Sequence, residues 1–298
     1  MTPFRERPIL QPLSRFVSEE HIRTLLILFS AIVFVFFTTK EYIPFAARLV
    51  VPFLLILLMT AGEVKQRVVL LFCVVLGLGL NVWANYYVIA NHGFMITYIG
   101  IALMIACASG AQASAVIARA AVLLISILMG LALIQKLVSP HYMSGALVGG
   151  YLANGYMFKT LISLFYSNWP EVVQQNLLAQ KALLSMPPGQ GNSVPLTVPP
   201  YLQLLAIILT YAALFSQIAI EACVLLRARL GMWTHYAVML FVLIIYSTRN
   251  ENVFLSMNLI LGYAMTDEHT KKARLWYVMG IAYLLVMEMM GLRPGIFG

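Results

Sequence analysis

Lys136 is the residue best placed to do chemistry in this otherwise apolar chain, in the segment Leu133-Ile-Gln-Lys136-Leu-Val-Ser-Pro140. Ionisable side chains are expensive at membrane depth, so each one is a functional hypothesis by default. A lysine at the end of an apolar run can simply extend its ammonium group to the lipid headgroups. A lysine that faces a cavity is desolvated, which favours the neutral amine that can act as a base. The sequence leaves both situations open.

Glu221 is the second candidate, because it lies well inside another apolar run, more than one helical turn before Arg227. The residues three and four positions away on either side carry no charge, so any charged partner must come from elsewhere in the chain. A structural carboxylate held by a neighbouring helix and a site carboxylate are the two alternatives. We treat Lys136 and Glu221 as the catalytic candidates.

Four further residues are candidates for a cavity or its mouth. His235 lies just inside an apolar run, where a lone histidine is more often a helix-contact residue than a ligand. Arg249 and Glu251 belong to a short polar segment between two apolar runs, which is either a solvated turn or a polar mouth facing a bundle interior. The four residues are His141, His235, Arg249 and Glu251.

Several common chemistries have no motif in this chain. It lacks HExxH, a His/Cys cluster, GxGxxG, a P-loop and GxSxG. Its three cysteines are far apart inside apolar runs, which is typical of small buried side chains. Asp267 is the one aspartate, so catalysis by paired aspartates is not expected. We therefore predict no metal site.

The amino-acid composition indicates the environment in which these candidate side chains lie. Of the 298 residues, 61% are hydrophobic and 10% are charged, whereas an ordinary soluble domain has about 25% charged residues. A soluble surface could not be covered with so few charges, which indicates an all-α, polytopic transmembrane helix bundle in a lipid bilayer. The net charge of +8 fits basic residues held in cytoplasmic loops better than nucleic-acid binding, which we do not expect.

Nine apolar runs are predicted as helices, each near the length that a bilayer requires. The run 253–265 is short, and it either crosses with a tilt or enters only part way, so the bundle has eight or nine spans. We expect one transmembrane domain over 1–298. It includes a cytoplasmic N-terminal segment over 1–23, which has no signal-peptide apolar region. The runs are 24–39, 44–61, 68–90, 95–109, 113–137, 201–226, 232–247, 253–265 and 275–292.

Basic residues predict the orientation of the bundle. With the N-terminus in the cytoplasm and nine crossings, the inner loops hold Lys65, Arg67, Arg119, Arg227, Arg229 and the cluster around Lys271, and the outer loops hold fewer basic residues. If the run 253–265 were re-entrant, the cluster around Lys271 would lie outside and the bias would nearly disappear. The charge pattern therefore favours nine crossings.

The segment 138–200 is predicted as the one long connection, on the outer side. Val173, Leu177, Leu178 and Leu184 recur at helical spacing after Pro170, which suits a first helical position. We expect short helices lying on the membrane face. A lid over a cavity of the bundle is the alternative.

Two stretches together resemble the membrane domain of the vitamin K-dependent gamma-carboxylase family, whose bacterial relatives carry the horizontally transferred transmembrane domain (HTTM). The first is Leu133-Ile-Gln-Lys136-Leu-Val-Ser-Pro140-His-Tyr-Met-Ser-Gly145. The second is Glu221-Ala-Cys-Val-Leu-Leu-Arg227-Ala-Arg229-Leu-Gly231. Their order and their separation by a long connection also fit. In that family the lysine deprotonates vitamin K hydroquinone, and the resemblance implies this role for Lys136.

The resemblance implies a bundle cavity that binds a quinone or a lipid, with a quinone as the expected cofactor. Its bacterial members imply a multi-pass protein of the bacterial inner membrane. A non-catalytic accessory or scaffold subunit with membrane-protein partners is the alternative, because no strong motif is present. A transporter is a further alternative, although no inverted repeat is visible.

Overall fold

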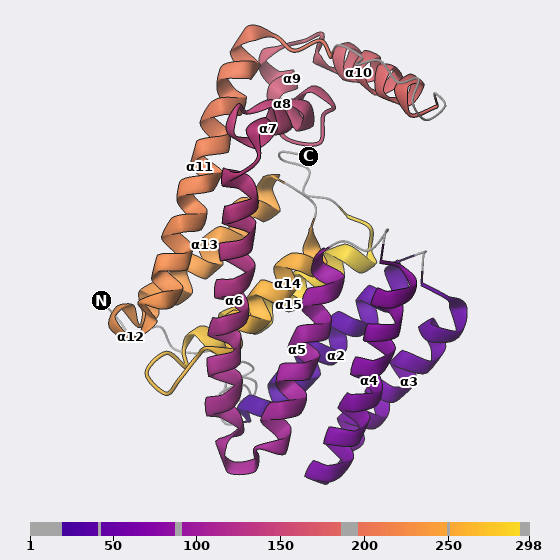
Figure 1. Cartoon of the computed structure of the whole chain (residues 1–298), viewed down its shortest axis with the longest axis vertical. Coiled ribbons are helices and arrows are strands. Elements are labelled where there is room, and N and C mark those ends of the chain that lie inside the picture. Colours follow the sequence, from indigo (N-terminus) through magenta and orange to yellow (C-terminus); the bar gives the residue numbers. More distant parts are fainter. Residues whose placement is uncertain (1–19, 41–42, 87–90, 186–195, 249–250, 293–298) are drawn as a thin grey trace, which may run out of the picture. The chain divides into compact units, whose positions relative to one another are not determined.

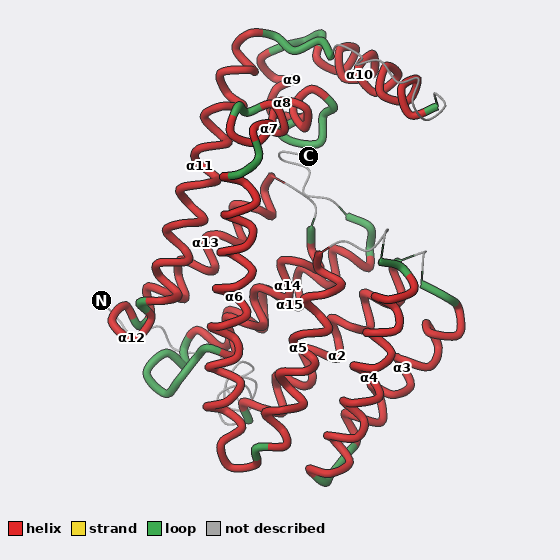
Figure 2. The backbone as a smooth tube through the Cα atoms, in the orientation of Figure 1, coloured by secondary structure: helices red, strands yellow, loops and turns green. Residues whose placement is uncertain are grey.

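A computed structural model describes residues 20–40, 43–86, 91–185, 196–248 and 251–292. All regular elements within these ranges are helices, and no strand is present in them. Figure 2 shows helices joined by short connections. The predicted all-α class is confirmed for the described residues.

The long helices coincide with the predicted apolar runs. Several edges differ by three or more residues, among them the ends of α4 and α15 and the start of α5. Helix α2 begins at His21, so that His21 to Arg23 are helical, and α4 begins at Val64, so that Lys65 and Arg67 lie in its first turn. The nine helices are α2 (His21–Thr39), α3 (Phe45–Thr60), α4 (Val64–Ala84), α5 (Asn91–Ala108), α6 (Ala113–Leu137), α11 (Pro200–Leu225), α13 (Met232–Thr248), α14 (Asn252–Ala264) and α15 (Ala273–Met289).

Four helical segments of the described chain are long and apolar enough to cross a membrane: His21–Thr39, Val64–Ala84, Gly110–Leu137 and Pro200–Leu225. The segment Gly110–Leu137 joins the short 3-10 helix η1 (Gly110–Gln112) to α6. Shorter apolar helices accompany them, among them α3, α13 and α14. These helices make the chain compatible with a multi-pass membrane protein.

The chain divides into two compact units, which are described separately. Unit 1 comprises residues 1–127, 223–242 and 251–292, and unit 2 comprises residues 128–222, 243–250 and 293–298. Helices α6, α11 and α13 contribute to both units. The expectation of a single transmembrane domain stays a prediction.

In unit 1, α14 lies along α2 in the core (Figure 1). Twelve of the 13 residues of α14 are buried. At one end, the rings of His21 and Tyr263 stack with centroids 5.2 Å apart. At the other end, Glu288 accepts a hydrogen bond from Lys40 at 2.9 Å and one from Asn252 at 3.2 Å. A helix that is buried on all sides lies inside a bundle. With 13 residues, α14 is shorter than the roughly 20 residues that a bilayer core requires.

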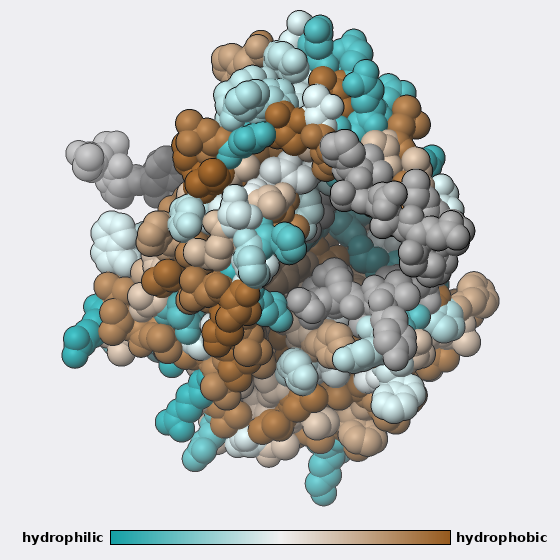
Figure 3. Space-filling model, turned by 45° about the horizontal axis from the view of Figure 1, so that its top comes forward, coloured by the Kyte–Doolittle hydropathy of each residue, from teal (hydrophilic) through white to brown (hydrophobic). Residues whose placement is uncertain are grey.

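The outer helices of unit 1 expose apolar side chains. Only three of the 16 residues of α3 are buried, and Phe53 and Ile56 are exposed. Leu76 and Leu80 of α4 are exposed as well. Apolar side chains occupy a large share of the surface seen in Figure 3. Such exposure would be unusual in water and is what a lipid environment allows.

In unit 2, four short helices follow α6, and they share an apolar core with α11. Trp169 and Leu152 are fully buried in this core and pack near Leu202 of α11. The prediction of short helices in the segment 138–200 is confirmed, including α10 with Pro170 in its first turn. These helices are α7 (Pro140–Met143), α8 (Ala146–Ala153), α9 (Lys159–Phe165) and α10 (Trp169–Leu184).

Two residues hold the short helices of unit 2 in place. Gly145 has φ +77°, and a Cβ there would lie 3.2 Å from the backbone of Ile207, so this position requires glycine. Asn176 of α10 is buried, and its amide nitrogen donates to the carbonyls of Ala153 and Thr197 at 2.9 and 3.0 Å. Its amide oxygen accepts from the backbone N–H of Thr197 at 2.8 Å. This side chain therefore fastens the segment before α11 to α8 and α10.

Candidate functional site

Lys136 lies in the last turn of α6 and is partly buried in unit 2. Its ammonium group donates a hydrogen bond to the amide oxygen of Gln217 on α11. The Nζ atom also lies 5.4 Å from the centre of the Tyr142 ring, within the range of a cation–π contact. All of these partners are uncharged. Among the described residues, no carboxylate forms an ion pair with Lys136.

Gln217 is the residue that connects the two long helices at this point. It is buried, and its amide nitrogen donates to the carbonyl of Met129 on α6 at 2.8 Å while its oxygen accepts from Lys136. Tyr142 lies on α7, and its hydroxyl donates to the carbonyl of Thr210 at 3.5 Å. Burial raises the pKa of the Tyr142 phenol, which keeps it neutral. We call Lys136, Tyr142, Gln217 and Glu221 the Lys136 site.

Glu221 is placed on the same helix as Gln217, four residues further along α11. Residues four apart lie on one helix face, so Glu221 is one turn from the amide that holds Lys136. The side chain is partly buried. The two catalytic candidates of the sequence therefore border the same stretch of α11, and Gln217 lies between them along the chain.

The mouth candidates do not gather at this site. His141 is exposed on α7. Arg249 lies outside the described residues. Glu251 is partly buried at the N-cap position of α14, in unit 1. His235 is buried in α13, also in unit 1, where it borders a different cavity.

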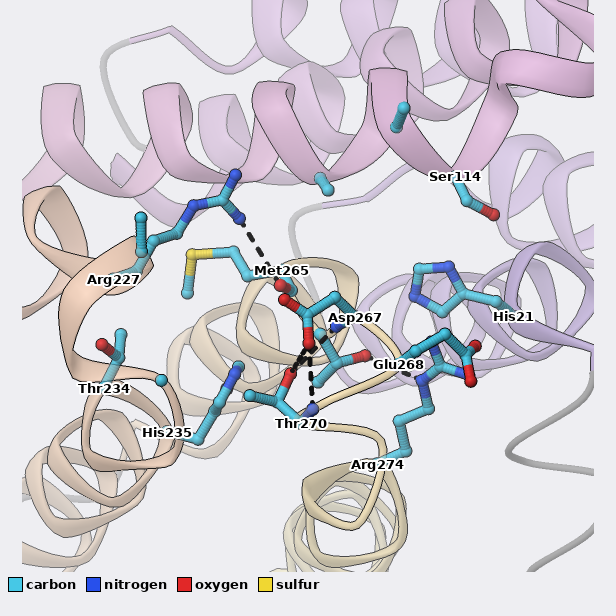
Figure 4. A pocket seen from close by; sticks show the side chains of 15 residues that line it. His21, Ser114, Arg227, Thr234, His235, Met265, Asp267, Glu268, Thr270 and Arg274 are labelled. Atoms are coloured by element: carbon cyan, nitrogen blue, oxygen red, sulfur yellow. Dashed lines mark hydrogen bonds between the residues drawn. The ribbon is translucent and has the colours of Figure 1, made fainter.

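That cavity, which we call the end pocket, has a volume of about 490 Å³ and lies in unit 1 where α2 and α6 begin and α14 ends. Figure 4 shows His21, Arg227, His235 and Arg274 around it, with the loop that follows α14 between them. The lining residues are His21, Ser114, Ala115, Ala118, Arg227, Ala228, Gly231, Thr234, His235, Met265, Thr266, Asp267, Glu268, Thr270 and Arg274.

Both histidines of the end pocket are buried and bonded on one ring nitrogen. Nε2 of His21 lies 3.3 Å from the carbonyl oxygen of Tyr263, and because a carbonyl only accepts, Nε2 must donate. Nδ1 of His235 lies 2.9 Å from the hydroxyl oxygen of Tyr277. Nδ1 of His21 is buried without a hydrogen-bond partner among the described residues. The pocket thus holds one unsatisfied buried ring nitrogen.

The loop after α14 carries the carboxylates of the pocket. Burial raises the pKa of Asp267, but hydrogen bonds from the Thr270 side chain and from the backbone N–H groups of Thr270 and His269 outweigh it, so the pKa lies below its usual value. A hydrogen bond from Lys271 and its charge lower the pKa of Glu268. Both carboxylates are therefore ionised at neutral pH.

Each arginine of the pocket donates to a neutral oxygen, and the charge of Arg274 also lowers the pKa of Glu268. Arg227 donates to the carbonyl of Met265 at 3.4 Å, and Nε of Arg274 donates to the hydroxyl of Thr266 at 2.8 Å. Arg274 is buried. The described residues contain no group of three or more His, Cys, Asp and Glu side chains that could hold a metal ion.

Sequence reasoning missed several of these residues. Gln217 is uncharged and separated from Lys136 by 81 positions, so no local pattern pairs them. The sequence predicts His21 in the cytoplasmic segment 1–23, before the first apolar run, whereas it is a buried residue in the first turn of α2. In the sequence, Arg227 is a loop charge within the second stretch of the family resemblance, and Arg274 belongs to the basic cluster around Lys271. Their arrival at one cavity depends on the packing of α13, α14 and α15.

Comparison with known proteins adds no relative: no family model, curated protein or solved structure matches the chain.

Proposed function

We propose that this chain is a multi-pass protein of the bacterial inner membrane with nine crossings and a cytoplasmic N-terminus. The support comes from unit 1, where the start of α14 meets Lys40 through Glu288 and its end meets His21. Helix α14 therefore runs beside α2 from one end to the other. A re-entrant segment would instead begin and end beside the same end of α2.

The charges support the same topology. The end pocket brings the start of α2 together with Arg227 and Arg274. These belong to the basic segments that the positive-inside rule assigns to the cytoplasm when α14 crosses. That topology assigns Lys40 to the outer side. Lys40 forms an ion pair with Glu288 and does not line the end pocket. Nine crossings account for both groups of contacts.

The function that the geometry supports best is binding and deprotonation of a quinol-sized amphiphile at the Lys136 site, as in the carboxylase membrane domain that the chain resembles. One observation carries this proposal: a partly buried lysine in an apolar helix pair has neutral partners and no ion pair among the described residues. A buried charge is normally paired or gives up its proton. Lys136 is therefore suited to meet an acidic hydroxyl or an anionic ligand.

The neighbours of Lys136 have distinct parts in this proposal. As a neutral amine, Lys136 donates one N–H to Gln217 and has its lone pair available to take the proton of a quinol hydroxyl, leaving a quinolate and an ammonium. Gln217 is a positioning residue, because its second bond, to the carbonyl of Met129, holds its amide in place. Glu221, one turn further on, balances the ammonium that forms.

Quinol oxidation tests the proposal. The purified protein in detergent is given a short-chain quinol with dioxygen as the oxidant, and the variants Lys136→Ala and Glu221→Gln are compared with Lys181→Ala, an exposed lysine of α10. We expect both site variants to lose turnover and the control to retain it. Equal turnover in all four proteins would exclude the Lys136 site as a catalytic site.

A second candidate is a non-catalytic accessory subunit of a membrane complex. The bonds of Gln217 favour it, because they join α6 to α11 as a purely structural clamp would. Purification in mild detergent tests this alternative. A stoichiometric partner protein together with unchanged function of the Lys136→Ala complex would support it, and an isolated active chain would exclude it.

A further inference from the structure

A groove in unit 1 lies where α3 ends and α4 begins, between two helices that run side by side (Figure 1). Its volume is about 510 Å³, which lies within the range of small-molecule sites. Its lining comes from the last turn of α3, the connecting turn and the first two turns of α4. We call this cavity the α3–α4 groove. It shares no residue with the Lys136 site or with the end pocket.

The lining of the α3–α4 groove changes from polar to apolar along the helices. Thr60, Lys65 and Gln66 line the end beside the connecting turn, and Val69 lies one turn further along α4. Leu57 lies three residues before Thr60 on α3. Because the short connection makes α3 and α4 antiparallel, both apolar side chains lie further from the connecting turn than the polar ones. A groove that is polar at one end and apolar at the other suits an amphiphile.

The apolar end of the groove leads onto an exposed apolar surface. Phe53 and Ile56 of α3 and Phe72 of α4 are exposed there. Further along, the two helices are in close contact, since a Cβ added at Gly77 would lie 3.3 Å from Cγ2 of Val51. The groove is therefore confined to the end of the helix pair, and an apolar chain that starts in it continues over the outer surface of α3 and α4.

The polar end of the groove is positively charged. Lys65 is exposed and has no hydrogen bond or ion pair with any residue that the structure describes. Arg67 is held against the connecting turn, where it donates to the carbonyls of Ala61 at 3.0 Å and Gly62 at 3.3 Å. Glu63 is exposed and pairs with neither cation. Two cations and one carboxylate give the segment 61–67 a net charge of +1, which favours an anionic headgroup.

The location of the groove in the membrane defines its occupant further. The topology proposed above places the connecting turn at the cytoplasmic surface, so that Lys65 lies at the depth of the lipid headgroups. Leu57 and Val69 then lie one turn deeper, beside the acyl chains. A water-soluble anion would leave the apolar end unfilled, and an uncharged lipid would leave Lys65 without a counter-charge. Anionic lipids of this leaflet attract basic side chains near its surface.

We propose that the α3–α4 groove binds an anionic phospholipid of the cytoplasmic leaflet. Lys65 pairs with the phosphate, and the amide nitrogen of Gln66 donates a hydrogen bond to a phosphate oxygen. The hydroxyl of Thr60 donates to the carbonyl of Leu57 at 3.0 Å, so its oxygen accepts from a headgroup hydroxyl. One acyl chain lies along Leu57 and Val69. The site rests on the membrane placement proposed above and is independent of catalysis at Lys136.

Lipid retention tests the proposal. The full-length protein is placed in nanodiscs that contain equal amounts of phosphatidylglycerol and phosphatidylethanolamine, and the lipid that stays bound is identified by native mass spectrometry. We expect phosphatidylglycerol to be retained about fivefold over phosphatidylethanolamine, as the attraction of one lysine to an anionic lipid provides. Equal retention of the two lipids, or retention of neither, would overturn the proposal. A protein dimer without lipid would identify a second copy as the occupant and would overturn it as well.

The lipid site can fail without the proposed function, because the measurements are separate. Quinol oxidation reports on Lys136, and chemical labelling at Lys40 and Lys271 reports on the crossings. A protein with the expected turnover and labelling but without a lipid preference would lose only the groove proposal.

A lysine variant locates the binding. Lys65→Gln is expected to lower the retention of phosphatidylglycerol about fivefold and to leave that of phosphatidylethanolamine unchanged. Lys272→Gln is the matched control, because Lys272 is an exposed lysine on the same predicted side of the membrane and does not line the groove. Equal loss in the two variants would mean a general charge effect and would overturn the site.

An isosteric variant tests the charge of the groove while Lys65 stays in place. Gln66 is exposed, and Gln66→Glu adds a carboxylate beside Lys65 without a change in bulk. We expect at least about fivefold weaker retention of phosphatidylglycerol, because the carboxylate repels the phosphate. Gln112→Glu, at an exposed position of η1 outside the groove, is the control. Wild-type retention by Gln66→Glu, or an equal loss in both variants, would contradict an anionic lipid in the groove even if Lys65→Gln fails to fold.

Discussion

The hydroxyl oxygen of Tyr277 lies 2.9 Å from Nδ1 of His235, so a fully buried phenol of α15 is fastened to a buried imidazole of α13. The same Tyr277 ring packs against Gly262, where an added Cβ would lie 2.5 Å from a ring carbon. Glycine at 262 therefore allows α14 and α15 to approach closely enough for this hydrogen bond to form.

This approach predicts that Gly262→Ala is destabilising. Overpacking of a core costs about 1–3 kcal/mol, and Tyr277 cannot move away without losing His235. Gly79→Ala in α4 is the matched control, since nothing lies within 4 Å of a Cβ there. We expect a lower melting temperature in detergent for Gly262→Ala and an unchanged or higher one for Gly79→Ala. The same temperature for both would contradict the close packing.

Asn176 should contribute strongly to the stability of unit 2. Asn176→Ala leaves two carbonyls and one backbone N–H without their partner, which costs about 2–4 kcal/mol for a buried side chain. Gln175→Ala, at the exposed neighbouring position of α10, serves as the control. Thermal unfolding of the two variants in detergent measures the difference in stability. If Gln175→Ala lost as much stability as Asn176→Ala, the hydrogen bonds of Asn176 would add nothing.

The lowered pKa of Asp267 predicts a small loss of stability in acid, through the loop after α14. Because the pKa of Asp267 is lowered in the folded protein, its contribution is complete above the unfolded pKa of about 3.9 and is lost as the pH falls through the lower, folded value. The side chain is exposed, so solvent screening limits the effect to less than about 1 kcal/mol. Asp267→Asn should remove this part of the pH dependence below pH 4, as measured by thermal unfolding across pH. An identical acid profile for the variant would refute the assignment.

The crossing of α14 can be tested by cysteine labelling. After Cys73, Cys107 and Cys223 are replaced by serine, Lys40→Cys and Lys271→Cys are treated in intact cells with a membrane-impermeant maleimide. Nine crossings predict that Lys40→Cys reacts at once and that Lys271→Cys reacts only after the membrane is permeabilised. Labelling of both positions in intact cells would mean that α14 does not cross.

The sequence predicted the helices better than the sites. A long apolar run identifies a helix without knowledge of its neighbours. All nine predicted runs therefore correspond to helices, namely α2 to α6, α11 and α13 to α15. The end of a run is less informative: the polar residues His21 and Lys65 are helical although they precede the apolar stretches. Their place in a helix follows from packing and backbone hydrogen bonding, which hydropathy does not record.

The sites depend on contacts between distant segments. Lys136 and Glu221 could be chosen because charge is rare in apolar runs, but Gln217 is a neutral residue in a long helix and gave no such signal. The end pocket unites segments from α2 to α15, and its histidines and arginines were visible only as separate loop or edge residues. Only the three-dimensional arrangement shows that they share a cavity.

We propose that Lys136 serves a ligand rather than the stability of the bundle, and Lys136→Met tests this role most directly. Methionine keeps the length and packing of the side chain and removes the amine. Measured in one preparation, quinol oxidation should fall at least about 100-fold, as expected for the loss of a general base, while the melting temperature changes little. Unchanged quinol oxidation with a clearly lower melting temperature would contradict the account and make Lys136 a structural residue.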